Sequence, residues 1–294
     1  MLRWRVILGL ALVATLVGAS VADIAMPGVW LGIVSLAVVG LASGEAIKLS
    51  RAAGLSPVAP LVHAGNLLIV ASAWLPLVCG WPVVAGQPAG LLFAPAASLT
   101  GCLLSALVIE IVRYRQAGGE TRRLAATAWP LCYVGLLFSF LVLLRSLNSG
   151  AAGVVMLLAM VTVVKLGDTG AYAVGRLVGR HKLAPHLSPG KTIEGAMGGL
   201  ALGSFGAWLV LVWIWPRAVG GEPARWTQWL AFGILVGVAG MLGDLAESLL
   251  KRDAAMKDSS RWLPGFGGVL DIVDSLLFAA PVAYFFFVWD RFGL

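Results

Sequence analysis

Repeated apolar stretches of about 20 residues are the feature that most restricts how this chain can fold. A stretch of that length crosses the hydrocarbon core of a bilayer as a helix, and a series of them has no place in a soluble domain. The composition agrees, because 60% of the 294 residues are hydrophobic, 12% are charged and the mean hydropathy is +0.92. The sequence therefore predicts an all-α, polytopic integral membrane protein. It excludes a soluble Rossmann or barrel enzyme, a disordered chain and a disulfide-stapled secreted domain.

Charged residues, prolines and glycine clusters divide the sequence into about nine candidate membrane spans. The second span is the shortest. The predicted spans are Val6 to Ala22, Gly28 to Ser43, Ala64 to Ala85, Gly90 to Val112, Ala125 to Leu144, Ala151 to Val178, Gly195 to Trp215, Trp229 to Leu250, and Gly268 to Trp289.

The basic residues separate by side of the membrane if the amino terminus is cytoplasmic. Cytoplasmic segments then hold sixteen of them, namely Arg3, Arg5, Lys48, Arg51, Arg113, Arg115, Arg122, Arg123, Arg176, Arg180, Lys182, Lys191, Lys251, Arg252, Lys257 and Arg261. The opposite side holds four, Arg145, Arg217, Arg225 and Arg291, and Lys165 lies inside a span. Because lysine and arginine accumulate on cytoplasmic loops, this bias predicts a cytoplasmic amino terminus and a carboxyl terminus outside. It also explains the net charge of +7 without nucleic acid as a partner.

The first span has a second interpretation as a secretory signal. Arg3 and Arg5 precede an apolar stretch that ends in Ser20-Val21-Ala22, an acceptable cleavage pattern. Cleavage after Ala22 would leave every later loop on the same side, so the charge bias does not decide between the two interpretations.

Acidic residues are concentrated in the second half of the chain. Most of the fourteen lie between Asp168 and Asp274, and an ionisable group in or near the hydrocarbon is a functional candidate by default. The carboxylates of the first half are interpreted as solvated helix ends: Asp23, Glu45, Glu110 and Glu120. Residues 1–150 are therefore predicted to be a scaffold that could offer lipid access or homodimer contacts. Residues 151–294 are predicted to be the catalytic region.

The first dense segment covers residues 167–199. Lys165 and Asp168 are three residues apart and share a helix face, where an ion pair would ease the burial of both. A basic loop follows and ends in Ser188-Pro189-Gly190-Lys191-Thr192, a glycine-containing turn that opens a helix and suits anions. It is not a Walker A loop, because Pro185 stands where that pattern needs glycine. A plain positive-inside loop is the alternative.

The second dense segment, residues 243–275, alternates carboxylates and cations. Asp244 and Glu247 are three apart near the end of one span, and Asp271 and Asp274 are three apart near the start of the next. Paired carboxylates repel unless a cation lies between them, and Mg²⁺ takes carboxylate oxygens together with substrate phosphates. The basic residues of this segment would suit the phosphates: Lys251, Arg252, Lys257 and Arg261.

With these residues the sequence resembles the phosphatidate cytidylyltransferase (CDP-diacylglycerol synthase) family of membrane enzymes. Residues 248–274 follow its signature S-x-[apolar]-K-R-x₄-K-D-x-[GSA]-x₂-[apolar]-P-x-H-G-G-[apolar]-x-D-R-[apolar]-D, except that Phe266 replaces the usual His and Ile272 the usual Arg. Residues 168–195 resemble a second family pattern, D-T-x-A-Y-x₂-G-R-x₂-G-[KR]-x-K-L-[AS]-P-x-[IL]-S-P-G-K-T-x-E-G. The first half resembles the family only in being apolar and helical.

The resemblance implies transfer of a cytidylyl group from CTP to phosphatidate at the cytoplasmic face of a bacterial inner membrane. Phosphatidate already carries an anionic oxygen, so the main task of the catalyst is to neutralise charge between two polyanions. Position by position, the resemblance implies Mg²⁺, in a two-metal or mixed-cation site, on Asp244 and Asp271, with Asp274 and Asp258 next. It implies a catalytic set of Asp244, Asp271, Asp274 and Lys257, and a substrate-binding set of Lys191, Ser188, Lys251, Arg252, Asp168 and Glu194, of which Asp168 and Glu194 are supporting residues.

Three alternatives stay open at the level of sequence. A related enzyme could act on another phospholipid, a CTP-dependent lipid kinase would need similar charges, and a polytopic transporter would also place charges in its helices. A transporter predicts an internal repeat, however, and the two halves of this chain are unlike. The departures at Phe266 and Ile272 are expected to leave an active enzyme, in which a packed apolar pair replaces His and Arg.

Overall fold

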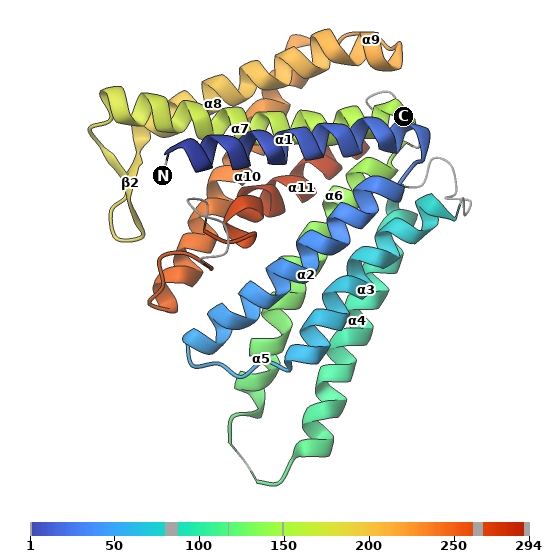
Figure 1. Ribbon diagram of the computed structural model, residues 1–294, viewed down its shortest axis with the longest axis vertical. Helices are drawn as coiled ribbons and strands as arrows, with labels where there is room; N and C mark the ends of the chain where they lie inside the picture. Colours follow the sequence, from blue (N-terminus) through green and yellow to red (C-terminus); the bar gives the residue numbers. More distant parts are fainter. Residues whose placement is uncertain (1, 80–87, 117, 149, 261–266, 291–294) are drawn as a thin grey trace. The chain divides into compact units, whose positions relative to one another are not determined.

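The computed structural model describes residues 2–79, 88–116, 118–148, 150–260 and 267–290, and within these it describes side chains from residue 14 onward except at residues 88, 89 and 290. Almost all of this chain is helical (Figure 1). The helices are α1 (Leu2–Ala25), α2 (Val29–Ala52), α3 (Ala59–Val78), α4 (Pro88–Arg113), α5 (Glu120–Pro130), α6 (Leu137–Ser146), α7 (Ala151–Val178), α8 (Ile193–Trp208), α9 (Trp215–Val219), α10 (Trp226–Asp253) and α11 (Leu270–Asp290). Two π-helical turns, η1 (Leu131–Leu136) and η2 (Leu209–Ile214), join α5 to α6 and α8 to α9.

Eight helical segments of the described chain are long and apolar enough to cross a membrane. They are Val29–Ala52, Ala59–Val78, Gly90–Arg113, Glu120–Ser146, Ala151–Val178, Ile193–Val219, Trp226–Asp253 and Leu270–Trp289. The prediction of an all-α polytopic membrane protein is thereby confirmed. The remaining predicted span falls within α1, of which Ala14–Ala25 counts as a shorter apolar helix, so the count of nine and the side of each terminus stay predictions.

Several predicted spans differ from the observed helices at their ends, and two of these differences have a clear sequence context. The second span was expected to stop at Ser43, but α2 continues to Ala52, and Glu45 within this extension is buried rather than solvated. The third was expected to begin at Ala64, but α3 already begins at Ala59, next to Pro60 in its first turn. Proline fits that position because its missing N–H would have no partner within the helix.

The chain forms two compact units. The first comprises Met1–Ser146 and Leu250–Val273, and the second Leu147–Leu249 and Asp274–Leu294. The segment Leu250–Val273 thus groups with the amino-terminal half, although the sequence places it beside the carboxyl-terminal helices. The expected division of function at residue 150, into a scaffold and a catalytic region, is not tested by these compact units and stays a prediction.

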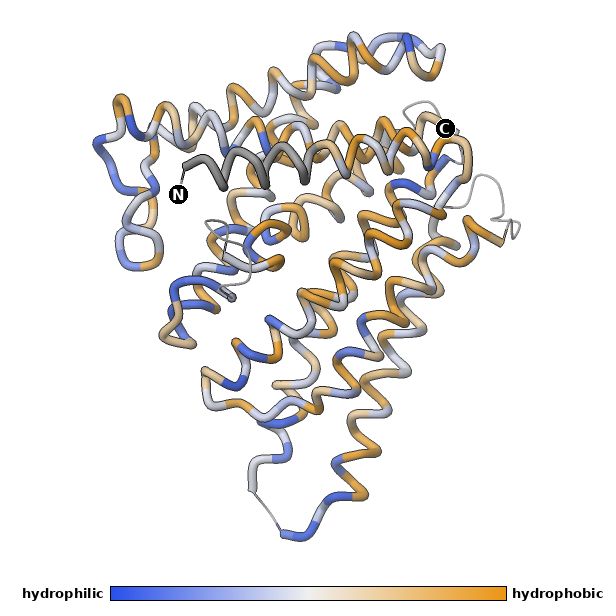
Figure 2. The backbone as a smooth tube through the Cα atoms, viewed as in Figure 1, coloured by the Kyte–Doolittle hydropathy of each residue, from blue (hydrophilic) through white to orange (hydrophobic). Residues whose placement is uncertain are grey.

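In the first unit α2, α3, α4 and the α5–α6 rod lie side by side (Figure 1). The contact is close where Gly65 faces Cys102 and Leu131, since a methyl group at Gly65 would come within 2.7 Å of the Leu131 side chain. Figure 2 shows the apolar residues along these helices and the hydrophilic ones gathered at helix ends and connections. A bilayer requires this distribution, because lipid-facing positions have no water to solvate polar groups.

The carboxylates of the amino-terminal half correct the sequence interpretation. Asp23, Glu45 and Glu110 were expected to be solvated, but all three are buried. Asp23 binds the buried Arg145, whose Nε lies 2.7 Å from Asp23 Oδ2, and Glu110 binds Arg123 at 2.8 Å. Each carboxylate therefore holds segments of the first unit together, as buried charges do when they are paired.

In the second unit α7 and α8 run side by side over their length (Figure 1). Glycines allow this approach, because a methyl group at Gly170 would lie 2.6 Å from the Gly198 carbonyl oxygen and one at Gly199 would lie 2.9 Å from that of Gly167. The segment that connects α7 to α8 forms a hairpin, in which β1 (Lys182–Ala184) pairs with β2 (Ser188–Thr192) and Lys182 lies opposite Thr192. The sequence predicted only a loop here.

Candidate active site

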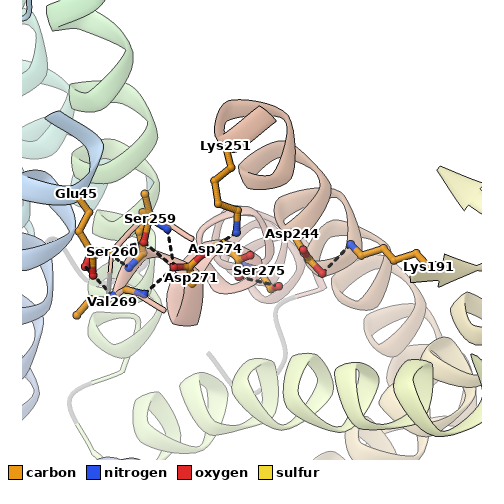
Figure 3. A network of polar contacts seen from close by, with 12 residues as sticks. Glu45, Lys191, Asp244, Lys251, Ser259, Ser260, Val269, Asp271, Asp274 and Ser275 are labelled. Carbon is orange, nitrogen blue, oxygen red and sulfur yellow. Dashed lines mark hydrogen bonds and ion pairs between the residues drawn. The ribbon is translucent and has the colours of Figure 1, made fainter. Parts of the chain in front are cut away.

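Five charged residues form the group that we call the lysine–aspartate cluster of the second unit: Lys165, Asp168, Lys191, Asp244 and Asp274. Its central contact joins Lys191 of β2 to Asp244 of α10. Their side chains point toward one another, and Lys191 Nζ lies 2.7 Å from Asp244 Oδ2 (Figure 3). Residues from the two charge-dense segments, 167–199 and 243–275, therefore meet in one ion pair.

Lys191 is positioned by Thr192, the residue that starts α8. Thr192 caps this helix by accepting a hydrogen bond from the Gly195 N–H at 3.1 Å. Its side chain also fills space left by Gly175 and Gly179 of the preceding segment, where a methyl group would come within 3.1 Å and 2.7 Å of Thr192 Oγ1. The hairpin end is thus anchored beside α7, and Lys191 precedes that anchor by one residue.

The hairpin itself is braced by Glu194. This carboxylate accepts hydrogen bonds from the backbone N–H groups of Arg180 at 3.0 Å and His181 at 3.2 Å, and it contacts His181 Nδ1 at 2.6 Å. Lys182 Nζ donates to the Pro189 carbonyl at 2.7 Å across the hairpin. Glu194 and Lys182 therefore shape the loop that carries Ser188 and Lys191. The supporting role in substrate binding expected of Glu194 stays a prediction.

Asp244 lies beside Asp274 because α10 and α11 cross at a glycine. A methyl group at Gly243 would lie 2.6 Å from the Asp274 carbonyl oxygen and 3.0 Å from the Ser275 Cα. Asp274 is buried, and its Oδ1 accepts hydrogen bonds from the backbone N–H and the hydroxyl of Ser275 (Figure 3). Asp244 interacts electrostatically with Asp274 and also with Asp168.

The other end of the cluster is the pair expected on α7. Lys165 Nζ lies 3.6 Å from Asp168 Oδ2, three residues along the helix, and both side chains are about half exposed. Lys165 also interacts electrostatically with Asp274. Two lysines and three carboxylates thus share one region of the second unit.

Asp271, expected as a metal ligand, lies in the first unit with both oxygens engaged. Its Oδ1 accepts from Lys251 Nζ at 2.6 Å, and its Oδ2 accepts from the Ser259 N–H, the Ser259 hydroxyl and the Gly268 N–H at 3.0, 2.7 and 2.6 Å (Figure 3). In this arrangement Asp271 orients Lys251 and holds the start of α11. Gly267, with φ +88°, makes the turn possible.

The remaining predicted residues lie at the surface of the first unit. Lys257 and Asp258 are exposed in the segment between α10 and α11, and Arg252 is exposed at the end of α10. Ile272 is partly exposed in the first turn of α11. Phe266 lies outside the described residues.

Glu45 of α2 is the residue that the sequence interpretation missed. Its two oxygens accept hydrogen bonds from the Val269 and Leu270 N–H groups at 3.1 and 2.7 Å, and from the Ser260 and Ser259 hydroxyls at 2.8 and 3.1 Å (Figure 3). The available signal was a carboxylate at the edge of an apolar span, which is costly unless it has partners. These partners lie more than 200 residues away, at a separation of 225 for Leu270.

The donor set of the second unit fits a hard cation. In the described part of the chain no group of three or more His, Cys, Asp and Glu side chains is arranged to hold a metal alone. Asp244 and Asp274 nevertheless provide two neighbouring carboxylates. Mg²⁺ is commonly held by one or two carboxylates together with water and substrate phosphates, so this pair suits it.

Comparison with known proteins places this arrangement in a family. The chain is 39% identical over 153 residues to a phosphatidate cytidylyltransferase of Bacillus subtilis, covering 52% of this chain and 54% of that protein. It is 42% identical over 152 residues to one of Staphylococcus saprophyticus, covering 52% and 54%. A phosphatidate cytidylyltransferase of Mycobacterium bovis is 32% identical over 291 residues, 96% of this chain and 87% of that protein.

These alignments differ in extent. The chain matches only about half the length of several of the relatives, as with the B. subtilis and S. saprophyticus proteins, but almost the whole of the mycobacterial one. A family model described as the cytidylyltransferase family matches residues 3–289, which include both sequence motifs and the amino-terminal helices. The chain therefore belongs to the cytidylyltransferase family.

Proposed function

We propose that this protein transfers the cytidylyl group of CTP to phosphatidate, forming CDP-diacylglycerol and releasing pyrophosphate. Family membership and the names of the relatives support this activity. The alternatives of a different lipid substrate, a CTP-dependent kinase and a transporter are outcomes of the test described below.

The observation that carries the proposal is the state of Lys191. Its Nζ is enclosed and lies 2.7 Å from Asp244 Oδ2, but it has no acceptor in full hydrogen-bonding geometry in the described part of the chain. A buried ammonium group with unused donors is unfavourable unless a ligand accepts from it. A phosphate oxygen provides both the negative charge and the acceptor. Lys191 is therefore our candidate for contact with the triphosphate.

The reaction requires an oxygen of the phosphatidate phosphate to attack the α-phosphorus of CTP. The bond from that phosphorus to the bridging oxygen of the β-phosphate breaks, and pyrophosphate leaves with the electron pair. No strong base is needed, because the attacking oxygen is already anionic. The protein must bring two polyanions together, which is a task of charge neutralisation and orientation.

The residues of the lysine–aspartate cluster divide this task. Asp244 holds Lys191 in place by the 2.7 Å ion pair, so that the ammonium group keeps a fixed direction. Asp244 and Asp274 would hold Mg²⁺, and the bound ion would neutralise negative charge on the triphosphate. Lys165 compensates the charge of Asp168 and contributes to the field at Asp274. In the first unit Asp271 orients Lys251, the second candidate for a phosphate contact.

We place the reaction at the cytoplasmic face of a bacterial inner membrane. CTP and Mg²⁺ are available there, and the distribution of basic residues assigns the loops with Lys191 and Lys257 to that side. Phosphatidate reaches such a site from the bilayer in which it resides.

Two labelled forms of CTP separate the candidate activities. The purified full chain is incubated with phosphatidate, Mg²⁺ and CTP labelled at either the α- or the γ-phosphorus. We expect the α-label to enter the lipid and the γ-label to leave as pyrophosphate. Transfer of the γ-label to lipid would indicate a kinase, and absence of either transfer, with phosphatidate and with other phospholipids, would contradict the proposal. Lys191→Met, which keeps the length of the side chain and removes its charge, should lose activity.

A further inference from the structure

We propose that Glu45, in the amino-terminal half of the chain, is a positioning residue for the cytidylyl transfer. Its carboxylate holds the start of α11 and the Ser259–Ser260 segment in the geometry that presents Lys251. This inference rests on the proposed function and extends it to a helix that the sequence interpretation treated as scaffold.

The first step is the cap that Glu45 places on α11. The first N–H groups of a helix have no partner within it. At the start of α11 the N–H groups of Leu270 and of Val269, the residue just before the helix, donate to Glu45 at 2.7 and 3.1 Å. The positive end of the helix dipole also favours a carboxylate at this point. The Glu45 side chain is buried, so these bonds are shielded from competing water.

The second step is the link from Glu45 to Asp271. Ser259 Oγ lies 3.1 Å from Glu45 Oε2 and 2.7 Å from Asp271 Oδ2. A hydroxyl has one hydrogen and donates to one of these carboxylates at a time, so the two acceptors share a single donor. Ser260 Oγ donates to the other Glu45 oxygen at 2.8 Å. Displacement of Glu45 would therefore remove one acceptor from each of the two serines.

The third step connects this network to Lys251. Asp271 Oδ2 is held by Ser259 and by the Gly268 N–H at 2.6 Å. Its other oxygen, Oδ1, accepts a hydrogen bond from Lys251 Nζ at 2.6 Å. The side chains of Lys251 and Asp271 are only 13% and 10% exposed. A shift of Ser259 would remove donors from Asp271 and let its carboxylate turn. The Lys251 ammonium group that Asp271 holds would then point in a different direction.

The glycines of the motif show how closely Glu45 fits. A methyl group at Gly268 would overlap the Ser259 hydroxyl and both carboxylate oxygens of Glu45. Gly268 therefore leaves the space that the Glu45 carboxylate occupies. This relationship gives a structural reason for the second glycine of the Gly-Gly pair.

Steady-state kinetics of Glu45→Gln test the proposal. Gln keeps the size of the side chain but replaces one acceptor oxygen by an NH₂ group, which would face the N–H or O–H donors now bound by that oxygen. We expect the KM for CTP to rise about 10-fold, in the range seen when a group that orients a site residue is removed. Lys251→Met should raise the same KM, and the double variant should show less than the product of the two effects. A loss of folded protein alone would lower kcat and leave KM unchanged.

Two further variants make the result specific. Glu110→Gln changes another buried glutamate of the first unit, which pairs with Arg123 instead of the α11 segment, and it should leave the KM for CTP unchanged. Ser260→Ala removes one partner of Glu45 without disturbing its charge, so it should raise the KM slightly even if Glu45→Gln folds poorly. A wild-type KM in both Glu45→Gln and Ser260→Ala would overturn the proposal.

Amide hydrogen exchange separates this inference from the proposed function. Glu45→Gln should accelerate exchange at Val269 and Leu270, a readout that requires no turnover. If the native protein transfers no cytidylyl group, the proposed function fails regardless of the exchange result. If it is active and Glu45→Gln exchanges faster without a change in KM, Glu45 is a cap alone and the positioning role is wrong.

Discussion

Lys191 Nζ and Asp244 Oδ2 lie 2.7 Å apart, so the basic loop after α7 and the acidic end of α10 meet in one ion pair. These residues are more than 50 positions apart in the sequence and belong to the two separate charge-dense segments. The pair brings a cation suited to phosphate next to a carboxylate suited to a metal ion. We expect such an arrangement to bind a metal–nucleotide complex better than either residue alone.

Asp244→Asn should reduce turnover by at least about 100-fold, because it removes a metal ligand and releases Lys191 at the same time. Asn preserves the shape of the side chain, so the variant protein should still fold and insert into the membrane. Pyrophosphate release from CTP, measured over a Mg²⁺ titration, checks the result. Asp253→Asn is the matched control, since Asp253 is an exposed carboxylate on the same helix and should be silent. Near-native activity of Asp244→Asn would remove Asp244 from the ligand set.

The helical membrane fold was predictable because a bilayer permits few alternatives. Backbone groups in hydrocarbon must be satisfied within the segment, so apolar stretches such as Ala151–Val178 imply helices directly. The hairpin was not predictable in the same way. Its strands β1 and β2 are three and five residues long, and they depend on pairing between Lys182 and Thr192 rather than on a local pattern.

The candidate site was predictable as a set of residue types but not as a set of contacts. The charged segments drew attention to Lys191, Asp244 and Asp271, each of which forms an ion pair in the structure, while the metal and phosphate roles expected of them stay predictions. Local spacing could not reveal that Asp271 has four donors, because three of them come from Ser259 and Gly268 through a reversal of the chain. Glu45 was missed for the same reason, since its partners are separated from it by more than 200 residues.

Gly243→Ala should impair both stability and activity. The added methyl group would lie 2.6 Å from the Asp274 carbonyl, a backbone atom that cannot move away cheaply, so α10 and α11 must separate. We expect a loss of about 1–3 kcal/mol in the free energy of unfolding, together with reduced turnover. Gly237→Ala on the same helix is the control, because its methyl group would meet only the end of the flexible Leu200 side chain at 3.1 Å. Equal thermal stability and activity of the two variants would contradict the close crossing as the cause.

Metal dependence should distinguish Asp274 from Asp271. Removal of divalent cations with a chelator should abolish turnover, and added Mg²⁺ should restore it. Asp274→Asn should then raise the Mg²⁺ concentration needed for half-maximal rate, because Asp274 lies beside Asp244. Asp271→Asn should instead raise the KM for CTP, because Asp271 holds Lys251. A shift in Mg²⁺ dependence for Asp271→Asn, without one for Asp274→Asn, would exchange the two assignments.

The membrane topology can be tested with single cysteines. We expect cysteines at positions 191 and 257 to be labelled from the same side as one at position 48, and that side to be the cytoplasm. The background must first lose Cys79, Cys102 and Cys132, two of which are exposed. Labelling of intact cells with an impermeant reagent should leave all three positions unmodified until the membrane is opened. Modification of position 191 or 257 from outside would contradict both the span count and direct access of CTP to the motifs.

The last prediction concerns Phe266 and Ile272, which replace His and Arg of the family signature. The carboxylates and lysines that we assign to metal and phosphate are all present, so we expect the native chain to release pyrophosphate in a reaction that depends on CTP and phosphatidate. Removal of a polar group together with its partner is nearly neutral, whereas removal of one leaves the other unsatisfied.

Phe266→His alone should therefore not raise the rate, because the imidazole would lack the arginine with which it would pair. Ile272→Arg alone would add a cation one residue from Asp271, where it would compete with Lys251 for that carboxylate, and it should lower the rate. The double variant should restore at most the native level. An inactive native protein that gains activity only when both substitutions are combined would show that the apolar pair is a defect rather than a compensated exchange.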